Sequence, residues 1–125
     1  MQRRCNTGYE DGNYSLVGGH KDADEEIRQS AIREAKEEVG IEINEKDLQF
    51  LQVMHRKVNK NEYIDFVFLA KKWEGTPIIN EPEECDELIW IEKTDMPDNV
   101  ILFIKSLLDE YFDDKMNSYV SKGWQ

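Results

Sequence analysis

The clearest hydrophobic pattern in the chain lies between residues 26 and 39. Apolar residues recur there at every fourth position, as on one face of a helix with 3.6 residues per turn: Ile27, Ala31, Ala35 and Val39. Acidic residues gather near the start of this segment, where the helix dipole favours negative charge. Gly40 follows at the position where helices commonly end in the left-handed conformation. We therefore predict a helix over residues 26–39.

Shorter runs rich in β-branched and aromatic residues predict strands. A turn-rich opening leads into a short strand that ends at the glycine pair Gly18 and Gly19, and three longer runs follow the helix. The predicted strands cover residues 14–17, 48–58, 63–73 and 87–92.

Asp and Pro residues at positions 95–99 are start signals for a last helix. Four apolar residues then share one face: Ile101, Ile104, Leu108 and Tyr111. The final segment, SYVSKGWQ, indicates no particular element. No repeat or linker divides the chain, so we predict one α/β (α+β) domain over residues 1–125, with helices on the faces of a sheet.

The composition, with 39% hydrophobic and 34% charged residues among 125, is that of a globular domain. Cys5 and Cys85 are too few and too far apart for a disulfide framework or a zinc site, which favours a reducing, cytoplasmic setting. No apolar run approaches the roughly 20 residues of a membrane span, and the first residues lack the apolar part of a signal peptide. We expect no membrane partner.

The formal net charge of −11 argues against a nucleic-acid polymer as partner, because such binding draws its affinity from Lys and Arg. A phosphate-bearing small molecule would also be repelled unless metal ions bridged it to the carboxylates.

The predicted helix carries a set of acidic residues that could hold such a metal. Glu34, Glu37 and Glu38 fall within an arc of roughly 100° on a helix. Their oxygens are the ligands that Mg²⁺ or Mn²⁺ prefers, and Arg33 lies one turn before Glu37, where it can pair with that carboxylate. Glutamate-rich helices commonly just expose their charged face to solvent. The spacing of these residues must therefore distinguish a metal site from such a face.

The spacing resembles the Nudix box. Gly19, five residues, Glu25, seven residues and then REAKEEVGI reproduce every fixed position of that motif, and Ala35 at the first aliphatic site is the single departure. The segments NTGYEDGNYSLVGGH, NEYIDFVFLAKKWEG and NEPEECDELIWI also resemble Nudix sequences, so the resemblance covers about residues 4–112.

This resemblance implies a Nudix-like α/β/α sandwich with a mixed, curved sheet and a loop-helix-loop catalytic motif. It implies Mg²⁺-dependent hydrolysis, with Mn²⁺ as an alternative, of a nucleoside diphosphate linked to another group. Glu34 and Glu38 would be the principal metal ligands, Glu37 a third ligand or part of the base system, and the Gly19 carbonyl a further ligand.

Other positions receive roles through the same resemblance. Glu25 and Arg33 would brace the loop against the helix, and the general base would be one of the box carboxylates or Glu81 in NEPEEC. Gly18, Gly19 and His20 would contact the substrate. Three strand aromatics could stack on a base, although their alternation favours a place in the core: Phe66, Phe68 and Trp90.

Three hypotheses stay open at this point. The first is a pyrophosphatase acting on a free nucleotide, including modified or oxidised nucleoside triphosphates. The second is an ADP-ribose or nucleotide-sugar hydrolase, because the box reads the diphosphate and not the attached group. The third is a nucleotide-binding sensor that has lost turnover, which the intact box carboxylates disfavour.

Nudix proteins normally carry an apolar strand before the position of Arg3 and Arg4, where this sequence has Met1 and Gln2. A sheet without that strand exposes an edge, so we expect either a homodimer or a less stable, shortened domain. A version extended upstream is expected to melt at a higher temperature, as measured by thermal unfolding. Equal melting temperatures would contradict this expectation.

Overall fold

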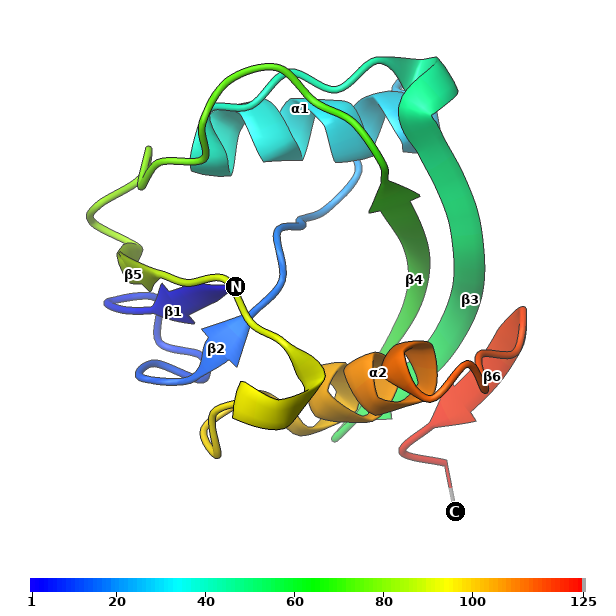
Figure 1. The fold of residues 1–125 in the computed structure, drawn as a ribbon. Coiled ribbons are helices and arrows are strands. Elements are labelled where there is room, and N and C mark those ends of the chain that lie inside the picture. The colour runs from blue at the N-terminus through cyan, green and yellow to red at the C-terminus, as the bar shows by residue number, and fades with distance from the viewer. Residues whose placement is uncertain (125) are drawn as a thin grey trace.

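The computed structural model describes residues 1–124, which form two helices and two small sheets (Figure 1). In chain order the elements are β1 (Gln2–Arg4), β2 (Tyr14–Ser15), α1 (Ile27–Val39), η1 (Glu45–Asp47), β3 (Leu48–Val58), β4 (Asn61–Ala70), β5 (Cys85–Leu88), η2 (Lys93–Asp95), α2 (Leu102–Phe112) and β6 (Tyr119–Lys122). No helix among these residues has both the length and the apolar character that a membrane span requires.

The strands pair into two separate sheets. The first has the order β2-β1-β5 and is antiparallel throughout. The second has the order β4-β3-β6, with β4 antiparallel and β6 parallel to β3, so it is the mixed sheet. Figure 1 shows that β3 and β4 curve from beside α1 towards α2. The predicted α/β class is confirmed, with its strands divided between two sheets.

Helix α1 forms as its apolar periodicity predicts. The Glu26 side chain accepts a hydrogen bond from the Arg28 N–H at its start, and Gly40 ends the helix with a φ of 70°. Ala35 and Val39 are buried and pack with Leu88 of β5. With this side of α1 against β5, Glu34 and Glu38 lie beside the glycine turn that follows β2.

A second hydrophobic cluster packs against α2. Tyr14 of β2 packs with Val100, Ile101 and Ile104, and this cluster joins the first sheet to the last helix. Tyr111 was predicted on the same inner face, but it is 41% exposed, because the buried side of α2 is centred on Ile104 and Leu107.

Two strands of the structure, β1 and β6, were not predicted from the sequence. β6 arises from the tail, where Val53 and Tyr119 begin a parallel pairing of four residues. β1 spans only three residues, yet it pairs with β2 on one side and β5 on the other. Strands this short carry no periodic signal, and the pairing partners supply their stability.

Candidate active site

The glycine turn between β2 and α1 lies directly against two box carboxylates. The Gly18 N–H donates to Glu38 Oε2 at 2.9 Å. Gly19 approaches Glu34 so closely that a Cβ added to it would lie 2.4 Å from Glu34 Oε1. Only a residue without a side chain fits there with Glu34 in its present position. The turn therefore brings its backbone within reach of both Glu34 and Glu38.

Arg33 ties the same loop to the helix. Its Nε and Nη2 atoms donate to the two carboxylate oxygens of Glu25 at 2.8 and 3.1 Å. Its Nη1 lies 3.0 Å from both Glu34 Oε1 and Glu37 Oε2, and Nη2 also donates to the His20 carbonyl at 3.2 Å. The predicted Arg33–Glu37 pair and the bracing of the loop by Glu25 and Arg33 are both present in the structure.

Glu25 and Glu38 have opposite electrostatic environments. The hydrogen bonds from Arg33 hold the pKa of Glu25 at about 2. The pKa of Glu38 is raised to about 7, mainly by burial and to a smaller extent by the charges of Glu34 and Glu81, while the hydrogen bonds from Gln2 and Gly18 lower it. Glu38 therefore holds a proton for part of the time near neutral pH, and a cation in place of that proton would be favoured.

Gln2 is a residue of this site that no sequence pattern predicts. It is 7% exposed on β1, and its Nε2 donates to Glu38 Oε1 at 3.2 Å. A glutamine in a short strand carries no sequence signal of this role, because its contact with Glu38 depends on how β1 packs beside α1.

Glu81 lies close enough to the helix carboxylates for their charges to affect its pKa. Burial raises the pKa of Glu81, and the nearby charges of Glu84, Glu83, Glu37 and Glu34 raise it further. Glu81 and Glu38 both line a cavity of about 130 Å³, together with Gln2, Arg4, Thr7, Ser15, Leu16, Glu84 and Cys85. The structure thus places the predicted base candidate Glu81 near the helix carboxylates.

The arrangement suits a divalent cation only in part. Within residues 1–124, no three His, Cys, Asp or Glu side chains converge as a finished metal site. Glu37 has a side chain that is 52% exposed and pairs with Arg33. Glu34 and Glu38 lie against that turn, where carboxylate and carbonyl oxygens match the ligand preference of hard cations. The donor chemistry fits such an ion.

A family model described as the NUDIX domain matches residues 1–111. The chain belongs to the Nudix family. The match includes the glycine turn, the whole of α1 and the loop that carries Glu81. The Nudix resemblance found in the sequence is therefore confirmed, and the protein is a hydrolase of this family.

Among solved structures, the chain is similar to a MutT NUDIX hydrolase from Burkholderia pseudomallei. The two are 26% identical in sequence, with a TM-score of 0.78, and the match covers 86% of this chain and 83% of that one. A search of curated protein sequences found no match. The structural likeness supports the Nudix fold over most of the chain.

The aromatic residues considered for base stacking lie in different surroundings. Phe68 meets Phe50 edge to face, with ring centroids 6.1 Å apart. Phe66 and Trp90 are 44% and 75% exposed, so their predicted place in the core is wrong. Phe66 lies on β4, an edge strand of its sheet, and Trp90 follows β5 with its ring stacked on Trp73.

The pairing of Glu25 with Arg33 predicts a pH-dependent contribution to stability. A lowered pKa means that this contribution is present above the ordinary pKa of 4.5 and is lost as the pH falls towards about 2. Glu25→Gln is expected to lower the melting temperature at pH 7, with the difference shrinking between pH 4.5 and 2. Thermal unfolding followed by circular dichroism across this range measures it.

Glu74→Gln is the matched control, because Glu74 is exposed and its side chain forms no hydrogen bond or ion pair in the described part of the chain. It should leave the melting temperature nearly unchanged. A pH-independent loss in Glu25→Gln would show that Glu25 acts by packing alone.

The close approach of Gly19 to Glu34 predicts the effect of a single methyl group. In Gly19→Ala the new Cβ displaces the flexible end of the Glu34 side chain, so the fold should survive while the carboxylate leaves the turn. Mn²⁺ affinity of the metal-free protein is expected to fall by about tenfold or more, as measured by electron paramagnetic resonance of free Mn²⁺.

Gly12→Ala serves as the control, since a Cβ at Gly12 meets nothing within 4 Å, although its φ of 86° adds backbone strain. Unchanged Mn²⁺ affinity in Gly19→Ala, with the parent binding Mn²⁺, would exclude Glu34 as a ligand.

Proposed function

We propose that this protein is a Mg²⁺-dependent pyrophosphohydrolase acting on a nucleoside diphosphate linked to another group. The preferred substrate in this proposal is a nucleoside triphosphate, including modified or oxidised forms, cleaved to the monophosphate and pyrophosphate. The observation that carries the proposal is the contact of Glu34 and Glu38 with the Gly18–Gly19 turn in a member of the Nudix family. Mn²⁺ is an alternative ion.

Each box residue has a role in this proposal. Glu34, Glu38 and the Gly19 carbonyl would hold Mg²⁺. Glu37 would be a further ligand if its side chain left the ion pair with Arg33 and bound the metal. Bound Mg²⁺ would offset the charge of the diphosphate and lower the pKa of a water molecule. Arg33 keeps the helix in register with the loop by its two bonds to Glu25.

Glu81 is the proposed acceptor of the water proton. Its pKa is raised by burial and by surrounding carboxylates, which makes it a better base than an ordinary exposed glutamate. It also shares a cavity with Glu38, so a proton can be taken up beside the metal ligands. The Gly18–Gly19 turn and His20 would contact the substrate.

The other hypotheses differ from this one in measurable ways. An ADP-ribose or nucleotide-sugar hydrolase would use the same carboxylates and release a different product. A sensor would bind nucleotides with no turnover. The intact box carboxylates favour hydrolysis over a sensor. A homodimer and a cytoplasmic location remain predictions.

A panel of nucleoside triphosphates, ADP-ribose and nucleotide sugars tests the proposal, with Mg²⁺ present and the products separated as nucleoside monophosphate with either pyrophosphate or a sugar phosphate. The parent is expected to hydrolyse a triphosphate. Glu38→Gln should lower kcat by about a hundredfold or more, because it removes a ligand charge while keeping the side-chain shape. Melting temperature and circular dichroism check that the variant is folded.

Glu74→Gln is the control for the same chemical change away from the site, and it should keep the parent rate. A Glu38→Gln variant as fast as the parent would overturn the metal assignment. Binding of every nucleotide without turnover by the parent would favour the sensor.

A further inference from the structure

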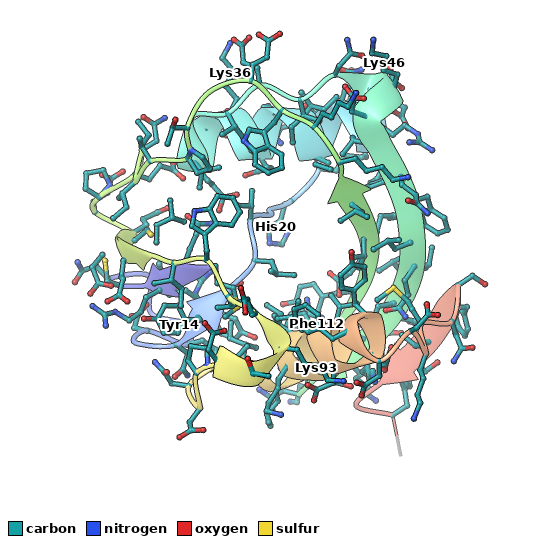
Figure 2. The ribbon with its side chains drawn as sticks, in the orientation of Figure 1. Tyr14, His20, Lys36, Lys46, Lys93 and Phe112 are labelled. Atoms are coloured by element: carbon teal, nitrogen blue, oxygen red, sulfur yellow. The ribbon has the colours of Figure 1, made fainter. Side chains whose placement is uncertain are left out.

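An aromatic pair joins the glycine turn to the second sheet. The rings of His20 and Tyr63 meet edge to face, with centroids 6.4 Å apart and an interplanar angle of 64°. Figure 2 shows His20 on the connection between β2 and α1. Tyr63 is the third residue of β4. His20 directly follows Gly19, which touches Glu34. The pair is therefore linked to the Glu34 carboxylate through Gly19, the residue before His20.

The Tyr63 ring is held in place by a contact with the guanidinium of Arg56. The Arg56 guanidinium lies 4.5 Å from the centroid of the Tyr63 ring and 4.1 Å from that of Phe103 in α2. Asp65 fixes this guanidinium through two hydrogen bonds, of 2.7 Å from Nε and 3.3 Å from Nη2. The Arg56 side chain is only 12% exposed. The Tyr63 ring is thus preorganised by a buried cation and does not depend on His20 for its position.

His20 is held by its backbone, and its ring has no hydrogen-bond partner among residues 1–124. Arg33 binds the His20 carbonyl, so the loop stays in place while the exposed imidazole can turn about its side-chain bonds. A flat ligand can therefore take up a position against Tyr63 without a change in the fold.

We propose that Tyr63 and His20 form the subsite for the nucleobase of the substrate. This inference rests on the proposed function, because it assumes that the diphosphate is bound at Glu34 and Glu38. Two rings beside a polyphosphate site offer π-faces on which a planar heterocycle can stack. Stacking accepts every base, so the subsite binds nucleotides in general and favours the larger purines.

Affinity measurements without turnover test this subsite. Ca²⁺ replaces Mg²⁺, and the ligands are ATP and inorganic tripolyphosphate, which carry the same triphosphate chain with and without a nucleoside. For the parent, ATP should bind more tightly than tripolyphosphate. In Tyr63→Leu the ratio of the two affinities should fall by about tenfold, because one base–aromatic stack is lost.

Three further variants make the result specific. Tyr63→Phe keeps the ring and should keep the ratio, whereas His20→Ala, a change in an exposed loop residue, should lower it by a smaller factor. Tyr119→Leu makes the same chemical change at an exposed tyrosine of β6 and should leave the ratio unchanged. His20→Ala also gives an answer if Tyr63→Leu does not fold.

Three outcomes would overturn the inference. Equal losses for ATP and tripolyphosphate in Tyr63→Leu would mean that Tyr63 supports the fold only. A parent that binds both ligands equally would mean that the base makes no contact. A parent that binds neither ligand would remove the proposed function together with this subsite, whereas a parent that binds both ligands equally would leave the hydrolysis proposal intact.

Discussion

The site depends on one cation, the guanidinium of Arg33, placed among carboxylates in a chain with a formal net charge of −11. Arg33 binds Glu25 with two hydrogen bonds, lies 3.0 Å from Glu34 and Glu37, and donates to the His20 carbonyl. A planar group with five donors can serve these partners at once, which a lysine cannot. Through Arg33, the loop after the glycine pair keeps a fixed position over α1.

The same constraint separates two kinds of carboxylate. Glu25, paired with Arg33, stays charged down to a pH of about 2 and stabilises the loop. Glu38, partly buried and bonded only to neutral donors, has a pKa raised to about 7 and carries its charge at a cost. A carboxylate that is costly to ionise in the free protein gains more from a nearby cation than an exposed one does, which agrees with the metal-ligand role proposed for Glu38.

The elements that the sequence predicted well are those with long local patterns. α1 and β3 match their predicted residues closely because thirteen helical residues and eleven strand residues give a clear periodicity. β1 and β6, with three and four residues, depend on strands that are distant in the sequence. The exposure of Phe66 and Trp90 depends on which surfaces other elements cover in the folded chain, and apolar character alone does not reveal this.

The sequence by itself determined the family and the identity of the box residues, because the Nudix motif is a fixed spacing along one short segment, and a helix turns that spacing directly into a shared face. It also determined the end of α1 at Gly40. Only the tertiary structure decided that Gln2 bonds to Glu38, that Glu81 shares a cavity with the helix, and that Tyr63 meets His20. These contacts join distant parts of the chain, and their existence depends on how the sheets and helices pack together.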